Sequence, residues 1–337
     1  MRGLTIARRL KEHEFLFVAN DDALEVLEPE FRVYRLPNLG TVFKNYQVDL
    51  LATVTKALPI LAQREKYLAE LSKVVRDFKP AVCMTDLEYF VPRLAKREGL
   101  PCLTLDHQHV ITLCEHHLPP NLYFDAFLQG LTPRYLFRPS DYNLLISFYA
   151  PPLLPNSRAR VVPPILREAV LKARPRDEGH VLVYQSNSTH KALLEFLQNS
   201  CQRTCYVFGY QKTAGQDKNV IFMPKSEEVF LRLLANASYV IQGGSHTLMS
   251  EALYLGKPIL SIPLEAMVEQ RFNALYLEKL GYGMQARMEA LSTELLQNFE
   301  AKLLYFRAEI AKHNFCGNDL VFSLVESFIE TGHLDLA

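Results

Sequence analysis

Short apolar runs recur along this chain, and stretches with helical periodicity separate each run from the next. Residues 81–85 (AVCMT), 102–105 (CLTL) and 180–184 (HVLVY) are examples of such runs. Strands that are apolar on both faces are typical of parallel sheets, because helical crossovers cover both faces of such sheets. The pattern therefore predicts an α/β fold with parallel sheets.

The alternation of strands and helices occurs in both halves of the chain. Its 337 residues suffice for two domains of about 150 residues each. The densest group of prolines, at 151–164, lies between the halves and is typical of an interdomain linker. We therefore expect an N-terminal domain at 1–162 and a C-terminal domain at 165–315. The expected strands are 14–19, 31–36, 81–85, 102–105, 144–148, 180–184, 204–208, 219–222, 238–241 and 258–262, and the expected helices are 1–10, 49–78 with an interruption near Pro59, 89–98, 191–198, 227–236, 246–255, 268–280, 294–312 and 319–330.

The order of elements at the start of the chain is unusual for an α/β domain. A helical pattern at 1–10 precedes the first strand-like run at 14–19, whereas such domains open with a strand, a loop and then a helix. We expect that a first strand and its glycine-rich turn are missing from this sequence. The alternative is a helix that simply begins the fold.

Composition and charge argue for an ordinary globular chain. Lys+Arg and Asp+Glu both number 37, so the net charge of zero argues against attraction of the whole protein to nucleic acid or an anionic membrane. The six cysteines are scattered, which favours reduced thiols over a metal site. No apolar run reaches the roughly 18 residues of a membrane span, and no signal peptide is recognisable. We expect a cytoplasmic protein; peripheral membrane contact stays open without support from the sequence.

The most informative segment is 239–283, where a buried strand runs into Gly243-Gly244. Two glycines allow a sharp turn and a close approach of the backbone to a ligand. Ser245 is a typical N-cap, so the following helix directs its free amides at the loop, which suits a diphosphate. Glu251 lies almost two turns into that helix, where a carboxylate is suited to accept hydrogen bonds from ribose hydroxyls.

A second group of polar residues follows the next strand. That strand ends at Pro263, and Glu269-Gln270 begins the following helix, with Asn273 one turn further on. Carboxylate and amide groups at the carboxyl end of a parallel strand are suited to bind sugar hydroxyls. Each feature alone has a simpler explanation, since a Gly-Gly pair is often only a turn. The ordered combination is far more specific.

The segment resembles the donor-binding signature of GT-B glycosyltransferases, the superfamily of the lipid II-forming N-acetylglucosaminyl transferase and the UDP-glucuronosyl and UDP-glucosyl transferases. It is most similar to a poorly characterised bacterial and archaeal branch with Glu-Gln in place of Asp-Gln. The matching residues are Gly243-Gly244, Thr247, Glu251-Ala252-Leu253, Gly256-Lys257-Pro258, Pro263, Glu269-Gln270 and Asn273-Ala274.

The resemblance implies two Rossmann-like domains and a role for each matching residue. A returning helix at 316–332 would complete the N-terminal domain. The implied roles are diphosphate binding for Gly243, Gly244, Ser245, His246, Thr247 and Ser186, ribose binding for Glu251, base binding for Phe222 and Met223, and donor-sugar binding for Glu269, Gln270 and Asn273.

The residue that activates the acceptor is harder to identify. Many relatives use a histidine in the first glycine-rich loop as a general base, and no residue here matches it. Asp86 and His107 or His109 follow strands of the first half and are candidates for this role. The alternatives are a helix cap for Asp86 and ordinary loop hydrogen bonds for the histidines. The histidine spacing fits no common zinc site.

These features predict an enzyme that binds a UDP-sugar between its two domains. It would transfer the sugar to a hydroxyl acceptor with inversion, with neither a metal ion nor a cofactor, because the helix dipole and amides stabilise the departing diphosphate. The alternatives are a UDP-sugar 2-epimerase and a nucleotide-sugar-binding protein or partner subunit without activity. The sequence identifies neither the acceptor nor the donor sugar.

Overall fold

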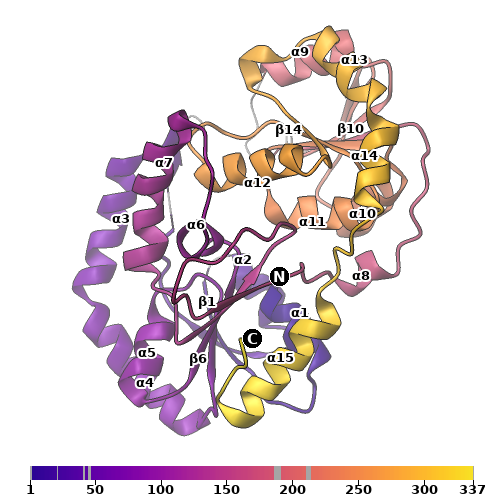
Figure 1. The fold of residues 1–337 in the computed structure, drawn as a ribbon. Coiled ribbons are helices and arrows are strands. Elements are labelled where there is room, and N and C mark those ends of the chain that lie inside the picture. The colour runs from indigo at the N-terminus through magenta and orange to yellow at the C-terminus, as the bar shows by residue number, and fades with distance from the viewer. Residues whose placement is uncertain are drawn as a thin grey trace. The chain divides into compact units, whose positions relative to one another are not determined.

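The computed structural model describes residues 2–20, 22–40, 42–44, 47–185, 191–209 and 214–336. The chain divides into two compact units, one of Met1–Ile165 with Gly317–Ala337 and one of Leu166–Cys316 (Figure 1). The expected proline-rich linker is wrong in part, because strand β8 (Ala159–Val162) lies within it and pairs with β7 (Tyr142–Ile146). Its pairing with β7 places this stretch in the sheet, and the residues at its two ends, Ala159 and Val162, are buried.

The first unit contains a four-stranded parallel sheet in the order β5-β6-β7-β8 and a separate parallel pair, β1-β2. A short antiparallel pair, β3-β4, accompanies them. The remaining elements of this unit are β1 (Leu16–Ala19), β2 (Arg32–Arg35), β3 (Phe43–Lys44), β4 (Gln47–Val48), β5 (Cys83–Thr85), β6 (Cys102–Asp106), α1 (Arg2–Arg9), α2 (Asp22–Leu27), α3 (Leu50–Ala62), α4 (Arg64–Phe78), α5 (Phe90–Glu98), α6 (Val110–Leu113), α7 (Pro120–Leu131), the π-helix η1 (Thr132–Leu136) and α15 (Asn318–Thr331).

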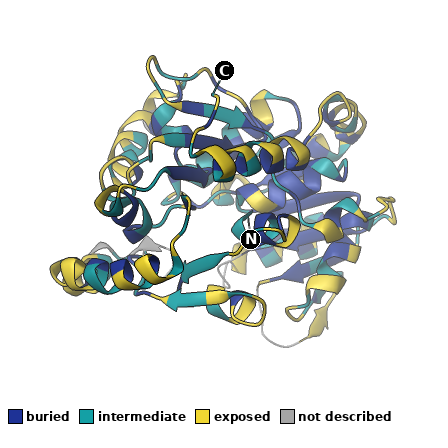
Figure 2. Cartoon of the chain, turned by 90° about the horizontal axis from the view of Figure 1, so that it is seen from below, coloured by how far each residue is buried: buried dark blue, intermediate teal, exposed yellow. Residues whose placement is uncertain are grey.

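The carboxyl-terminal helix α15 packs on the four-stranded sheet of this unit. Val321, Val325 and Phe328 are fully buried in one cluster with Leu103 of β6 and Leu144 of β7. Burial of such side chains contributes about 1.5–3 kcal/mol each. Figure 2 shows that many strands are buried, whereas the helices carry exposed residues on their outer sides.

A cavity of about 670 Å³ separates the two parallel sheets of the first unit. Strands β1 and β5 both line it, and among the described residues β1 pairs only with β2 and β5 only with β6.

The helical stretch at 49–78 is interrupted near Pro59, as expected, although Pro59 itself lies within the first of the two helices. Pro59 lies inside α3, and the helix ends one turn later at Gln63, where ψ reaches 10°. Pro59 has no N–H donor, but its carbonyl accepts a hydrogen bond from the Gln63 amide at 3.2 Å.

The second unit contains a seven-stranded sheet in the order β11-β12-β10-β9-β13-β14-β15. All neighbours are parallel except β11 and β12. Its elements are α8 (Glu168–Leu171), β9 (Val181–Tyr184), α9 (Lys191–Ser200), β10 (Cys205–Phe208), β11 (Gly215–Asp217), β12 (Val220–Phe222), α10 (Glu227–Asn236), β13 (Tyr239–Gln242), α11 (His246–Tyr254), β14 (Ile259–Ser261), α12 (Val268–Lys279), β15 (Gly283–Gln285), the 3-10 helix η2 (Met288–Ala290), α13 (Thr293–Ala301) and α14 (Leu303–Ile310).

The prediction of an α/β fold is confirmed. The strand order also shows the switch point of the sheet, which is the place where the order of the strands reverses. The chain builds β9, β10 and β12 toward one edge, then returns to place β13 on the other side of β9. Ligands of open parallel sheets bind at the carboxyl ends of strands where the order reverses. The expected helix at 294–312 is two helices, because the backbone leaves helical geometry at Lys302.

Candidate functional site

The glycine loop 243–245 lies at the switch point of the second unit. It connects β13, which ends at Gln242, to α11, which begins at His246. Strand β9 is the neighbour of β13, and Tyr184 is in register with Gln242. The loop therefore lies at the sheet edge where this architecture binds ligands.

Glycine is required at position 244 for two reasons. Its φ of +102° is a conformation that side chains rarely adopt, and an added Cβ would lie 2.8 Å from the backbone oxygen of Gln270. At Gly243 an added Cβ would lie 3.0 Å from Oε1 of Gln185. The loop thus packs closely against the first turn of α12 and the end of β9.

Asn273 and Gln270 hold this loop and its surroundings in place. The Asn273 side chain is fully buried, and its Nδ2 donates a hydrogen bond to the Gly244 carbonyl at 3.0 Å. The half-buried Gln270 accepts one through Oε1 from the Leu264 amide at 3.1 Å. The structure therefore gives Asn273 a supporting contact with the loop, where the sequence suggested a contact with the donor sugar.

The loop amides converge on one oxygen atom of Gln242. Oε1 of Gln242 accepts hydrogen bonds from the amides of Gly244, at 3.1 Å, and Ser245, at 2.9 Å. Its Nε2 is buried and makes no hydrogen bond to the described residues, and the same holds for Nε2 of Gln185. Neither glutamine was among the predicted site residues, although each polar side chain comes at the end of an apolar strand.

The amino-terminal end of α11 is partly open. Ser245 occupies the N-cap position as expected, but its hydroxyl makes no capping hydrogen bond, so the first-turn amides gain no partner from it. Thr247 is exposed, whereas His246 is buried with its Nε2 3.5 Å from the hydroxyl of Ser250. Amides at such a terminus, together with the helix dipole, favour an anion.

Glu251 forms a two-pronged ion pair with Arg167. Nε and Nη2 of Arg167 donate to the two carboxylate oxygens, both at 2.7 Å, and the Glu251 side chain is only 3% exposed. Nη1 of the same guanidinium donates to the exposed Glu227 at 2.5 Å. Burial lowers the pKa of Arg167, but the hydrogen bonds and charges of both carboxylates raise it above its ordinary value. No sequence motif indicated Arg167, which lies 84 positions before Glu251.

The other predicted donor-site residues occupy the same unit. Glu269 is half-buried in the first turn of α12, and Phe222 is buried at the end of β12. The amide of Met223 donates to the carbonyl of Val207 at 2.8 Å. Ser186 lies outside the described residues.

The candidate bases lie in the first unit and differ in accessibility. Asp86 follows β5, and its 38% exposed carboxylate accepts hydrogen bonds from Nε and Nη2 of Arg2 at 3.1 and 2.6 Å. His107 is 1% exposed, and its Nδ1 lies 2.9 Å from the carbonyl of Ile146, so this nitrogen carries the proton.

His109 forms a buried pair with Asp106. Its Nδ1 lies 2.6 Å from the Asp106 carboxylate and its Nε2 3.2 Å from the Pro133 carbonyl. Burial lowers the pKa of His109, but the Asp106 charge and hydrogen bond raise it above the ordinary value. Because both ring nitrogens face acceptors, the surroundings favour the protonated ring, which is poorly suited to accept a proton.

Neither a candidate metal cluster nor a helix suited to span a membrane occurs in the described part of the chain. There, no group of three or more His, Cys, Asp or Glu side chains is arranged to hold a metal ion. The helices described are also each too short or too polar to cross a membrane.

Comparison with known proteins gives consistent similarities. A model of Glycosyl transferase family 1 matches residues 2–304. An uncharacterized glycosyltransferase of Methanosarcina acetivorans is 39% identical over 82 residues, which are 24% of this chain and 21% of that protein. The matched part thus spans about a fifth of this relative.

Solved structures match nearly the whole chain. The glycotransferase of kitacinnamycin has a TM-score of 0.65 at 15% identity, with 96% of this chain and 94% of that chain covered. MurG of Acinetobacter baumannii has a TM-score of 0.63 at 16% identity, and the same shares of the two chains are covered. A variant of Os79 from O. sativa in complex with UDP has a TM-score of 0.64 at 15% identity, with 97% of both chains covered.

Proposed function

The chain belongs to glycosyl transferase family 1 and has the GT-B fold, and from this premise we propose that it transfers a sugar from a UDP-sugar to a hydroxyl acceptor. One observation carries the proposal for the donor. The amides of Gly244 and Ser245 point at a single oxygen beside the amino terminus of α11. This is the arrangement by which backbone amides bind phosphate oxygens.

The diphosphate would take the place that Oε1 of Gln242 occupies. A phosphate oxygen carries charge, so its hydrogen bonds to the same amides are stronger than those of a neutral carboxamide. The α11 dipole adds to this preference. Gly243, Ser245, His246 and Thr247 would complete the diphosphate site, and the solved complex of Os79 with UDP supports this choice of nucleotide.

Glu251 would bind the ribose while Arg167 holds its carboxylate in place. Each carboxylate oxygen can accept about two hydrogen bonds, and the Arg167 guanidinium contributes one to each. Acceptor capacity therefore remains for the vicinal hydroxyls of a ribose.

Further contacts would involve the base and the donor sugar. The backbone at Phe222 and Met223 would contact the base, at the carboxyl end of β12. The donor sugar would contact Glu269 and the part of Gln270 that the Leu264 amide leaves open. Asn273 would support the loop instead of the sugar.

For acceptor activation we assign the base to Asp86 in preference to His107. Its carboxylate is far more exposed than the His107 ring, and two hydrogen bonds from Arg2 hold it in position. In the reaction the acceptor oxygen bonds to the anomeric carbon as the bond to the diphosphate breaks. Asp86 takes the hydroxyl proton, UDP leaves, and the configuration inverts. The helix dipole and amides stabilise the leaving group without a metal ion or a cofactor.

A second function, binding without transfer, has one observation in its favour. Every candidate base already has a partner: Arg2 for Asp86, the Ile146 carbonyl for His107, and Asp106 with Pro133 for His109. Such a protein would bind the nucleotide-sugar without consuming it.

Isothermal titration with UDP, UMP and uridine tests the donor site. We expect UDP to bind most tightly, with UMP at least about tenfold weaker, because UMP lacks the second phosphate. Equal affinity for UDP and uridine would refute the diphosphate site. Release of UDP from UDP-sugars in the presence of an acceptor mixture would distinguish sugar transfer from binding alone. Release of an epimerised free sugar without any acceptor would show that the protein is an epimerase and not a transferase.

A further inference from the structure

The outer face of α3 is largely apolar, although Thr55 and Lys56 are also exposed. Leu51, Val54 and Leu58 have the spacing of one helix face and are exposed over 75%, 43% and 58% of their surfaces. Pro59 and Ala62, in the last turn of the helix, are also exposed. A surface helix normally turns its polar side chains to water and its apolar side chains inward. The exposed face of α3 therefore carries apolar side chains where polar ones are expected.

The outer face of α7 and η1 is aromatic. Four residues of α7 and one of η1 are exposed over about half of their surface or more: Tyr123, Phe124, Phe127, Leu128 and Tyr135. The four rings alone expose roughly 500 Å², because an aromatic side chain presents about 150–250 Å². The largest apolar patch on a typical monomer covers about 300–600 Å² in total.

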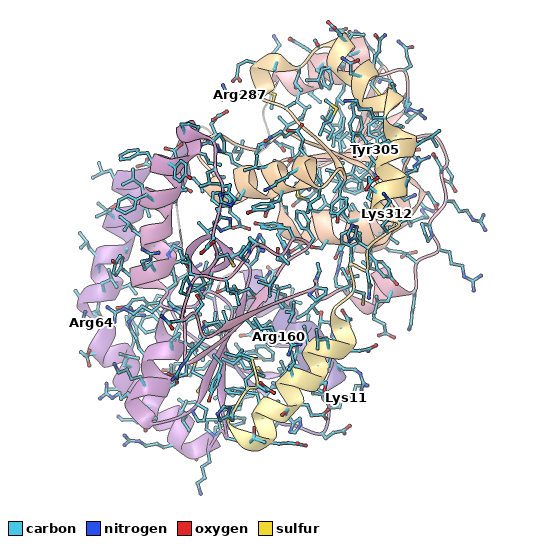
Figure 3. The ribbon with its side chains drawn as sticks, in the orientation of Figure 1. Lys11, Arg64, Arg160, Arg287, Tyr305 and Lys312 are labelled. Carbon is cyan, nitrogen blue, oxygen red and sulfur yellow. The ribbon has the colours of Figure 1, made fainter. Side chains whose placement is uncertain are left out.

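These two faces belong to one region of the first unit. On their buried sides, Ala57, Ile60 and Leu61 of α3 pack in the same cluster as Leu136 and Phe137, which follow α7. Figure 1 shows the two helices next to each other, and Figure 3 shows side chains projecting outward from both. Eight of the twelve large hydrophobic residues that are exposed in the described chain lie here. We call these eight, Leu51, Val54, Leu58, Tyr123, Phe124, Phe127, Leu128 and Tyr135, the α3–α7 patch.

The exposed charges beside the patch have one sign. Within 50–62 and 120–138 the exposed ionised side chains are Lys56, Arg134 and Arg138, whereas the single acid, Asp125, is half-buried. The chain as a whole has no net charge. A local excess of basic residues around apolar and aromatic side chains complements an anionic lipid surface.

We propose that the α3–α7 patch docks on the surface of an anionic lipid bilayer. Phe124, Phe127 and Leu51 would enter the boundary of the acyl chains, and the tyrosine rings would lie at headgroup level, where one end is apolar and the other polar. Lys56, Arg134 and Arg138 would contact lipid phosphates. The proposal does not depend on sugar transfer, since it concerns only the first unit.

Flotation with lipid vesicles tests the proposal on the full chain. We expect binding to vesicles of phosphatidylcholine with 30% phosphatidylglycerol and much weaker binding to phosphatidylcholine alone. The double variant Phe124→Ser/Phe127→Ser should lose at least about tenfold in vesicle affinity, since two large apolar side chains no longer insert. Lys56→Glu/Arg134→Glu should reduce binding and its salt dependence.

The matched control is Leu304→Ser/Tyr305→Ser on α14 of the second unit, where both side chains are also exposed (Tyr305 is labelled in Figure 3). It should bind vesicles like the unchanged protein, and all variants should keep their melting temperature and UDP affinity. Equal vesicle binding by the Phe124/Phe127 variant and the control would overturn the proposal. The proposal would also be overturned if the unchanged protein binds no vesicles but forms a dimer, and if the Phe124/Phe127 substitutions dissociate that dimer.

Discussion

Arg167 and Glu251 form the most completely buried arginine–carboxylate contact of the described donor site, with both nitrogen–oxygen distances at 2.7 Å. The same guanidinium also binds Glu227, whose side chain is 62% exposed. One arginine thus holds a buried and an exposed carboxylate. Burial makes the first contact costly to break, because an unpaired charge would stay inside the protein, whereas an exposed pair contributes little.

Glu251→Gln should therefore have a large effect and Glu227→Gln a small one. We expect Glu251→Gln to lower the free energy of unfolding by about 2–4 kcal/mol, since the Arg167 charge loses its buried partner. Glu227→Gln should lower it by less than about 1 kcal/mol. Denaturant titration measures both. In isothermal titration Glu251→Gln should also lose at least about tenfold in UDP affinity; equal affinity in the two variants would exclude Glu251 from the ribose site.

Gly244→Ala should abolish donor binding, with Gly256→Ala as its control. Both glycines have positive φ, +102° and +71°, so alanine costs about 1–2 kcal/mol of strain at either position. Only at Gly244 would the new Cβ also meet the backbone of Gln270, at 2.8 Å, whereas open space surrounds Gly256. We expect loss of UDP binding for Gly244→Ala alone. Retention of affinity would mean that the loop does not contact the diphosphate.

Substitution of Gln242 tests the proposal that the diphosphate takes the place that Oε1 of this residue occupies. Gln242→Glu places a carboxylate on the amides of Gly244 and Ser245, where it would compete with the diphosphate through charge-assisted hydrogen bonds. UDP affinity should fall at least about tenfold. Gln242→Ala frees the amides and should keep or raise the affinity. If the alanine variant loses as much affinity as the glutamate variant, Gln242 supports the loop and does not mark a phosphate position.

The sequence predicted the glycine loop and most strands because their signals are local. A short apolar run before Gly243-Gly244 is enough to place the loop at a strand end. Strand β15 was missed because it has only three residues and begins with glycine, and an added Cβ at Gly283 would lie 1.9 Å from the Ile259 carbonyl. That requirement for glycine comes from a neighbouring strand, which no local window contains.

The contacts that define the site were less accessible to prediction. Arg167 is far from Glu251 in sequence and carries no motif, so only the fold brings the two together. Asn273 follows the expected pattern, but its hydrogen bond to Gly244 depends on how closely α12 approaches the loop. Gln242 did have a local signal, a polar residue that ends a buried strand directly before the glycines.

The buried pair of His109 and Asp106 should make stability depend on pH. Burial lowers the pKa of His109, but Asp106 raises it above the ordinary 6.5, and burial raises the pKa of Asp106, but His109 lowers it below 3.8. A raised histidine pKa contributes stability that is complete below pH 6.5 and lost as the pH rises through the folded-state value. The Asp106 contribution is lost only as the pH falls through its lowered value.

The contribution of this pair to the free energy of unfolding should therefore decrease as the pH rises between pH 5 and 9, because His109 is the member of the pair that titrates in that range. His109→Gln keeps hydrogen-bonding groups but carries no charge, so its profile should be flatter over the same range. His313→Gln, at a histidine outside this pair, should keep the slope of the unchanged protein. Denaturant titration at several pH values measures the three profiles. A slope in His109→Gln as steep as that of the unchanged protein would show that His109 is not protonated in the folded state.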